Sequence, residues 1–224
     1  EDNLIPTGMA RYDHIDRNHK PQNRILFAPS WRKYLTTEIK ASNWEANEDR
    51  IRKSDYYKNF YAFLSDKTLH RKLENSKVFL DIKLHPIIAN LKNLFDIDCE
   101  YINMVSGDVD VADYKAFVTD FSSYVFDFAY LNRPIMYFVP DYPQFKSGMN
   151  HYRDLDLPFD EAFGHMFTDA HKAAECLCEI VDRDFVPEQI YAERMENFYF
   201  DFDGNCAENL YKFVVEQDKL FSQQ

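Results

Sequence analysis

Short apolar runs alternate with longer amphipathic stretches along most of the chain. The runs are rich in Ile, Leu, Val and Phe and lie at 24–31, 77–86, 99–104, 116–119 and 135–139. Runs of this length that end at turn residues are typical of buried strands. Helical spacing predicts helices between and after them, at 48–75, 87–95, 108–115, 123–131, 169–183, 187–198 and 205–222. This alternation predicts an α/β fold with a doubly wound parallel sheet covered by helices on both faces.

The composition is that of an ordinary globular protein. Of the 224 residues, 46% are hydrophobic, 17% aromatic and 29% charged, which separates the chain from disordered sequences. The net charge of −12 opposes binding of nucleic acid through a diffuse basic face. Anionic small molecules remain possible ligands, because a few local Arg, His and backbone N–H donors can hold a phosphate whatever the global charge.

Cysteine usage and hydropathy indicate a soluble, cytoplasmic location. The four cysteines form no C-x-x-C pair, which favours reduced thiols over a disulfide framework. No apolar run approaches the roughly 20 residues that span a bilayer, and no signal-peptide pattern opens the sequence. We expect a soluble protein whose contact with a membrane, if any, is peripheral.

Four loops follow the predicted strands and are the places to look for chemistry. In a doubly wound sheet, ligands bind beyond the carboxyl ends of the strands, where neighbouring loops meet. The loops after the first four runs contain polar or basic residues next to a proline or a helix start, at 28–32, 83–86, 103–107 and 120–123. We therefore expect these loops to form a shared site.

The serine pair Ser122 and Ser123 has two interpretations. Either hydroxyl can cap the helix that begins near Tyr124 and do nothing else. Alternatively, the two hydroxyls and the helix N-terminus form a phosphate cradle that needs no lysine. Asp127 lies in the first turn of the same helix, where a carboxylate is favoured in any case.

His85 and Arg32 are the other polar candidates. His85 follows a strand and precedes a proline, so it can donate to a phosphate or exchange a proton near neutral pH, or simply be exposed. Arg32 follows Pro29 and Ser30 and can clamp phosphate oxygens through two donors, or be a surface cation.

Several other kinds of site are disfavoured. Five glycines in the whole chain leave no Gly-rich phosphate loop, and the sequence has no HExxH motif. Asp108, Asp110 and Asp113 are interpreted as acids at the start of a solvated helix rather than as metal ligands. We expect neither a metal nor a cofactor.

The ordered motifs resemble one enzyme family. "ILFAPSWR", "KLHP", "FVTDFSSYVFDFAYLNRPIMYF" and "FDGNCAENL", preceded by a GxxRxD-like "PTGMARYD", are similar to the carboxyl-terminal half of the CDP-glycerol glycerophosphotransferases. These are the TagF/TagB-like polymerases and primases of teichoic acid and related capsule synthesis. The resemblance implies the C-terminal, donor-binding Rossmann-like half of a GT-B fold, with the amino-terminal acceptor domain missing. Its domains would be an incoming linker (1–20), the donor-binding domain (21–186) and helices that pack on either domain (187–224).

The resemblance also implies a reaction and a set of site residues. A polymer hydroxyl would attack the β-phosphorus of CDP-glycerol and release CMP, at the cytoplasmic membrane surface in the full-length protein. His85 falls on a catalytic position, and Ser30, Arg32, Asp120, Ser122, Ser123 and Asp127 fall on donor-binding positions. A second histidine in the amino-terminal domain would be the general base, so this polypeptide alone would bind nucleotide and turn over poorly.

Departures from the family pattern leave the donor open. Phe121 replaces the usual tyrosine, and the segment 146–167 follows the family only loosely, although Arg153, His151 and His165 within it are further candidates for ligand contact. A CDP-ribitol or another activated alcohol would fit the same scaffold. The alternatives are a GT-B glycosyltransferase that uses a nucleotide sugar, and a non-catalytic nucleotide-binding or interaction module.

Overall fold

A parallel six-stranded sheet forms the centre of the molecule. The computed structural model describes residues 7–40, 43–149, 155, 157–199 and 204–221. The strand order is β5-β4-β1-β6-β7-β8 and reverses between β1 and β6, as in a doubly wound fold. The predicted fold class is confirmed. The strands are β1 (Arg24–Ala28), β4 (Phe79–Ile82), β5 (Ile102–Met104), β6 (Ala116–Thr119), β7 (Ile135–Phe138) and β8 (Met166–Phe167).

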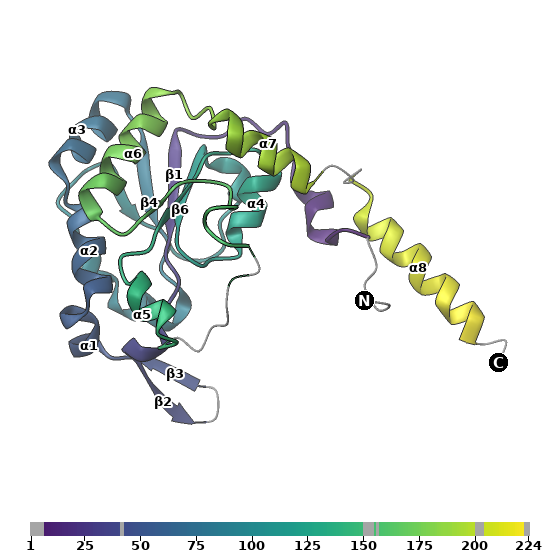
Figure 1. Ribbon diagram of the computed structural model, residues 1–224, viewed down its shortest axis with the longest axis horizontal. Helices are drawn as coiled ribbons and strands as arrows, with labels where there is room; N and C mark the ends of the chain where they lie inside the picture. The colour runs from purple at the N-terminus through teal and green to yellow at the C-terminus, as the bar shows by residue number, and fades with distance from the viewer. Residues whose placement is uncertain (1–6, 41–42, 150–154, 156, 200–203, 222–224) are drawn as a thin grey trace.

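Helices cover both faces of this sheet (Figure 1). Alternate residues of β1 enter different cores, since Ile25 and Phe27 belong to one hydrophobic cluster and Leu26 and Ala28 to the other. Both faces of a strand are therefore buried, which explains why the strands read as unbroken apolar runs. One face packs on α2 (Asp55–Leu64), α3 (Lys67–Ser76) and α6 (Ala170–Asp182), and the other on α4 (Tyr124–Tyr130) and α7 (Gln189–Phe198).

The segment predicted as one helix at 48–75 is three helices. α1 (Glu48–Lys53) ends before Ser54, whose side chain accepts a hydrogen bond from the Tyr57 N–H at the start of α2. Asp66 accepts from Thr68 and Leu69 at the start of α3. These are N-cap contacts, which favour a new helix start over a continuous helix.

Several elements differ from the predicted ones. The segment at 108–115 holds only a short 3₁₀ turn, η4 (Val111–Asp113), and the helix at 87–95 is the 3₁₀ segment η3 (Pro86–Phe95). The sequence patterns also missed η2 (Lys33–Leu35) and the short helix α5 (Tyr142–Lys146). They missed an antiparallel hairpin as well, which is formed by β2 (Thr36–Lys40) and β3 (Asn43–Ala46).

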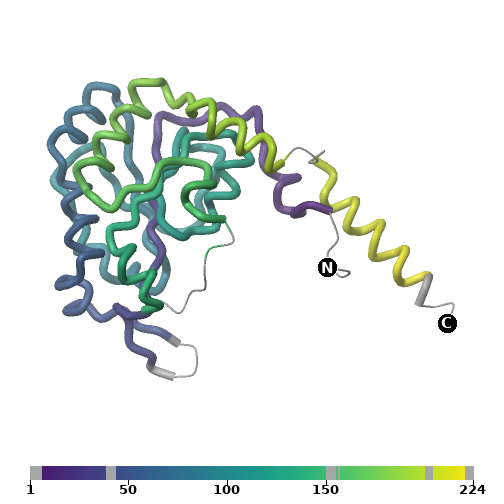
Figure 2. The backbone as a smooth tube through the Cα atoms, in the orientation of Figure 1, coloured from purple at the N-terminus to yellow at the C-terminus, as the bar shows by residue number. Residues whose placement is uncertain are grey.

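The first and last described helices contact each other. η1 (Ala10–His14) lies within the segment predicted as a linker and packs against α8 (Cys206–Phe221), which extends away from the sheet (Figure 2). The Asp13 carboxylate accepts hydrogen bonds from the backbone N–H groups of Cys206 and Ala207, at 2.9 and 2.7 Å. None of the helices in the described residues is both long enough and apolar enough to span a membrane.

Candidate functional site

The carboxyl ends of three neighbouring strands form a common pocket. Ser30 follows β1, His85 follows β4, and Ser122 and Ser123 follow β6, and all four line a pocket of about 290 Å³. We call this cavity the donor pocket, after the role that is proposed for it below. The parallel strands place the loops at one edge of the sheet, which is why residues separated by more than 90 positions meet.

The two serines differ in their local contacts. The Ser122 Oγ accepts a hydrogen bond from the Tyr124 N–H at 3.3 Å, which is a weak version of the expected cap. Ser123 occupies the N-cap position of α4 with helical φ and ψ and is exposed, and its side chain makes no cap hydrogen bond with the described residues. Capping therefore accounts for Ser122 in part and does not account for Ser123.

His85 is held in one orientation at the edge of the pocket. Its Nδ1 accepts from the Ile87 N–H at 3.3 Å, so in the neutral ring the proton lies on Nε2. Partial burial lowers the pKa of His85 below its usual value. The imidazole is thus mostly neutral at pH 7 and offers an N–H donor.

Lys83 brings a positive charge to the same pocket. It lines the pocket beside His85, and its Nζ donates to the backbone carbonyl of Gly107 in the loop after β5. The pocket therefore combines an ammonium, an imidazole N–H and serine hydroxyls. Such a set suits a phosphate or diphosphate, because each group can donate to a negatively charged oxygen.

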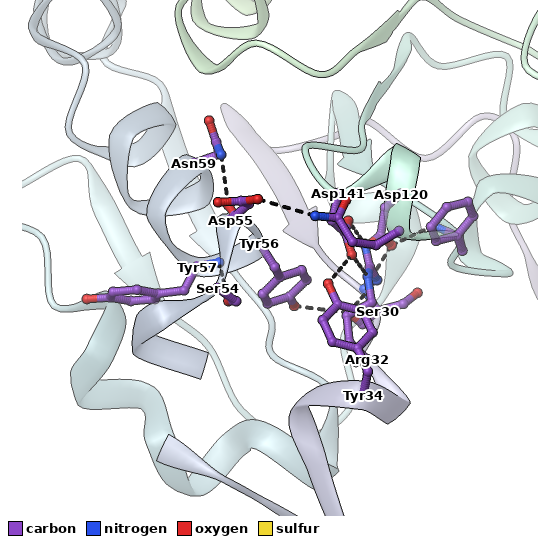
Figure 3. A network of polar contacts seen from close by, with 12 residues as sticks. Ser30, Arg32, Tyr34, Ser54, Asp55, Tyr56, Tyr57, Asn59, Asp120 and Asp141 are labelled. Carbon is purple, nitrogen blue, oxygen red and sulfur yellow. Dashed lines mark hydrogen bonds and ion pairs between the residues drawn. The ribbon is translucent and has the colours of Figure 1, made fainter. Parts of the chain in front are cut away.

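Arg32 does not lie open to a ligand as expected from the sequence. Its side chain is fully buried, with Nε 2.6 Å and Nη2 2.8 Å from the Asp141 carboxylate and Nη1 2.8 Å from Asp120 (Figure 3). The rings of Tyr56 and Phe121 lie 4.7 and 5.1 Å from its guanidinium carbon. All of its charge is thus satisfied inside the protein. We call Arg32, Asp120 and Asp141 the buried network.

Asp120 also faces the protein rather than the pocket. Its Oδ1 accepts from the N–H groups of Ser30 at 2.8 Å and Phe121 at 2.5 Å, and its Oδ2 contacts Arg32. The carboxylate therefore ties the loop after β1 to the loop after β6. The network holds the backbone from which the pocket serines project.

Asp141 and two tyrosines complete the network and were missed by sequence reasoning. The Tyr34 hydroxyl donates to Asp141 Oδ2 at 2.6 Å, and the Tyr56 hydroxyl donates to the Ser30 carbonyl at 3.0 Å. Burial acts to raise the pKa of Asp141, but hydrogen bonds from Arg32 and its charge outweigh burial and hold that pKa below its usual value. Asp141 follows β7, so the same strand-end rule would have found it.

Asp127 is directed toward the segment that precedes the sheet. It is buried in α4, and its Oδ1 lies 2.9 Å from Arg11 Nη2 in η1. Burial raises the pKa of this carboxyl, against the opposing effect of Arg11. In the GxxRxD-like segment, Arg11 therefore pairs with α4 while Asp13 caps α8, so both contacts are structural.

The remaining candidates lie elsewhere. His165 bonds to the Tyr191 hydroxyl at 2.9 Å and to Glu188 at 3.2 Å, just before β8, and does not line the donor pocket. Asp110 caps η4, and the Oδ1 atom of Asp113 lies 2.8 Å from the Nε2 atom of His19. Arg153 and His151 lie outside the described residues.

Comparison with known proteins gives one family and several relatives. The family described as CDP-Glycerol:Poly(glycerophosphate) glycerophosphotransferase matches residues 1–216. The chain is 22% identical to the minor teichoic acid biosynthesis protein GgaB of Bacillus subtilis over 97% of this chain and 24% of that protein. It is 27% identical to the teichoic acid poly(glycerol phosphate) polymerase of Staphylococcus epidermidis over 78% of this chain and 22% of the relative.

A solved structure shows the same fold. The wall teichoic acid polymerase TagF superposes with a TM-score of 0.52 at 21% identity, covering 97% of this chain and 50% of that one. A variant of it soaked with CDPG gives 0.53 at 18% identity, covering 96% and 48%. The expected Rossmann-like half of a GT-B fold is confirmed. The chain spans about a quarter of the length of the two curated relatives and half of the solved polymerase.

Proposed function

Because the chain belongs to the CDP-glycerol:poly(glycerophosphate) glycerophosphotransferase family, we propose that it binds CDP-glycerol or a related CDP-alcohol through the donor pocket. One observation carries the proposal: hydroxyls, an imidazole and an ammonium from three separate strand ends line a single pocket where the strand order reverses. That position is where doubly wound folds bind nucleotides. The TagF structure soaked with CDPG supports the assignment of donor class.

The proposed reaction is transfer of a polyol phosphate. A terminal hydroxyl of the growing polymer gives its proton to a general base in another part of a longer protein and attacks the β-phosphorus, a new P–O bond forms, and the bond to the bridging oxygen breaks. CMP leaves with the electron pair of that bond. The protein's task in such a step is mainly to position the diphosphate and stabilise its negative charge. His85 Nε2–H, the Lys83 ammonium and the hydroxyls of Ser122 and Ser123 supply these donors in the proposal.

Arg32, Asp120 and Asp127 act indirectly in this proposal. The first two are saturated by internal contacts and keep the pocket loops in place, and Asp127 pairs with Arg11 at 2.9 Å. We therefore assign contact with the CDP-alcohol to Ser30, Lys83, His85, Ser122 and Ser123, and loop support to the buried network. No step is assigned to Arg153, which lies outside the described residues.

The polymer acceptor is proposed to bind another part of a longer protein. The relatives are several times longer than this chain, and α8 presents Leu210, Tyr211 and Val214 to solvent with 41%, 69% and 55% exposure. We infer that an acceptor domain covers this apolar face, and that the full-length protein works at the inner surface of the cell membrane. Chemical cross-linking from α8 in a full-length protein checks the first point, and cell fractionation the second.

Calorimetry on the chain tests donor binding. We expect CDP-glycerol to bind and the double variant Ser122→Ala, Ser123→Ala to bind it about tenfold or more weakly, since a hydrogen bond to a charged group contributes about 1.5–3 kcal/mol. CDP-ribitol and UDP-sugars are measured in parallel to define the donor. Ser76→Ala is the matched control, because Ser76 precedes β4 and so lies at the amino-terminal end of the strands, away from the donor pocket.

Three results would count against the proposal. Binding of a UDP-sugar with no response to any CDP ligand favours a nucleotide-sugar glycosyltransferase. An unchanged affinity in the double serine variant assigns the serines to helix capping alone. Failure of the unaltered chain to bind any nucleotide supports a non-catalytic module.

A further inference from the structure

The imidazole of His85 has a ring contact besides its hydrogen bond. The centroids of the His85 and Trp31 rings lie 6.0 Å apart, with an angle of 34° between the ring planes. Pro86 restricts the backbone of His85 to extended conformations, but it leaves the imidazole free to turn. The hydrogen bond from the Ile87 N–H to Nδ1 is long, at 3.3 Å, and is weak on its own. The indole of Trp31 therefore provides a second contact that limits the orientation of the imidazole.

Trp31 is itself fixed by its two neighbours in the chain. The Ser30 N–H donates to the Asp120 carboxylate, and the guanidinium of Arg32 is buried against the same carboxylate. The backbone of Arg32 is extended, and successive side chains of an extended segment point to opposite sides. Because Arg32 enters the core, the Trp31 side chain takes the other side, where it meets His85.

The β2–β3 hairpin supports Trp31 in turn. Trp44 on β3 packs against Trp31 with ring centroids 5.8 Å apart, and the Lys33 ammonium lies 4.9 Å from the centroid of the Trp44 ring. The hairpin also contacts η3, the segment that begins directly after His85. Trp44, Trp31 and His85 thus form a series of ring contacts that links the hairpin to the donor pocket.

We propose that Trp31 is a positioning residue for His85, an inference that rests on the proposed function. Trp31 is not among the residues that line the donor pocket, so it acts through the imidazole rather than on the ligand. It keeps the ring in the orientation in which Nδ1 accepts from the backbone and Nε2–H remains available to the ligand. A ring that had to be ordered during binding would bind more weakly, because each side chain immobilised at a binding site costs conformational entropy.

Calorimetry with CDP-glycerol tests this role in binding. Trp31→Leu removes the flat ring, and we expect about three- to tenfold weaker binding, whereas Trp31→Phe should restore binding to within about twofold of the unaltered chain. In the His85→Gln background, Trp31→Leu should weaken binding by less than about twofold, because the side chain through which Trp31 acts is absent. Phe79→Leu is the matched control, since Phe79 pairs with Tyr101 at the amino-terminal end of β4, and it should leave the affinity unchanged.

Tryptophan fluorescence gives a signature that needs no ligand. Trp31 and Trp44 are the only tryptophans of the chain, so in Trp44→Phe the emission comes from Trp31 alone. A protonated imidazole in contact with an excited indole quenches its emission by accepting an electron. We therefore expect the emission to fall between pH 7 and pH 5, as His85 takes up its proton, and the additional substitution His85→Gln to remove most of that fall. This measurement stands even if Trp31→Leu does not fold.

The outcomes separate this inference from the proposed function. Equal weakening by Trp31→Leu with and without His85 overturns the inference, since a purely structural role acts in both backgrounds. Unchanged CDP-glycerol binding in Trp31→Leu also overturns it, as does a fall in emission that persists in His85→Gln. If the unaltered chain binds no CDP ligand, the proposed function fails and the inference falls with it. Binding that needs Ser122 and Ser123 but does not change in Trp31→Leu contradicts this inference alone.

Discussion

The buried network and the donor pocket lie within a few residues of each other along two loops and differ in how their polar groups are satisfied. In the network, a guanidinium with no exposed side-chain surface contacts two carboxylates at 2.6–2.8 Å. In the donor pocket, the Ser123 hydroxyl makes no cap contact with the described residues, and His85 uses one ring nitrogen for a backbone N–H at 3.3 Å. The charges of the buried network are paired inside the protein, whereas the donor pocket retains polar groups that can donate to a ligand.

This difference suggests separate tasks for the two groups of residues: the network holds the loops in place, and the pocket side chains are proposed to contact the ligand. Asp120 accepts from the Ser30 N–H while it pairs with Arg32, so the network sets the backbone positions of two pocket loops. A buried charge set can do this because each charge is paired with an opposite one, and removal of one partner leaves the other buried and unpaired. His85 and Ser122 make longer internal hydrogen bonds, at 3.3 Å each, so we expect the pocket residues to contribute less to the stability of the fold than the network.

Arg32→Ala should give the largest effect and tests the supporting role of the network. It leaves two carboxylates buried without their cation, and we expect a loss of about 3–5 kcal/mol in the free energy of unfolding. Urea denaturation followed by circular dichroism measures it. The matched control is Arg52→Ala, because Arg52 forms an exposed i,i+4 pair with Glu48 at 2.7 Å, which should contribute about 0.3–0.5 kcal/mol. Similar losses in both variants would contradict the role of the network.

The comparison also shows why the fold could be largely predicted from the sequence. Buried parallel strands are mainly apolar on both faces, so β1, β4, β6 and β7 appear in the sequence as distinct apolar runs. This signal does not depend on which segments pack against them. The β2–β3 hairpin has no such signal, because its strands are short and part of its packing is against distant segments. Trp44 on β3 packs against Trp31 with ring centroids 5.8 Å apart, and the hairpin contacts η3 some 40 residues later.

The site could be predicted only in part, for a related reason. The strand-end rule predicted that Ser30, His85 and the two serines lie together, and the structure places them in one pocket, since the rule depends on topology alone. It could not separate residues that face the pocket from residues that face the core. Arg32 is buried because Asp141, 109 positions away, meets it, and no local pattern reports that partner. Asp141 itself was missed although it also follows a strand.

The pH dependence of donor binding should give a smaller effect and sharpens the contrast at His85. Burial lowers the pKa of His85, so the ring is neutral at pH 7 and gains its charge only as the pH falls below its usual pKa of about 6.5. The protonated ring attracts the diphosphate more strongly, and we expect CDP-glycerol affinity to rise several-fold between pH 7 and pH 5. Calorimetry at several pH values measures this change. His85→Gln should abolish the rise, and an unchanged rise in that variant would place the titrating group elsewhere.

Ser123→Ala should have the smallest effect on stability and defines the pocket side of the comparison. Ser123 is exposed and its side chain makes no cap contact with the described residues, so the free energy of unfolding should change by less than about 0.5 kcal/mol. A working N-cap serine would instead cost about 1 kcal/mol on the same substitution. Urea denaturation and CDP-glycerol calorimetry on the same preparation separate the two roles. Lost affinity at unchanged stability indicates that the Ser123 hydroxyl contacts the ligand. Lost stability at unchanged affinity indicates instead that Ser123 stabilises the fold.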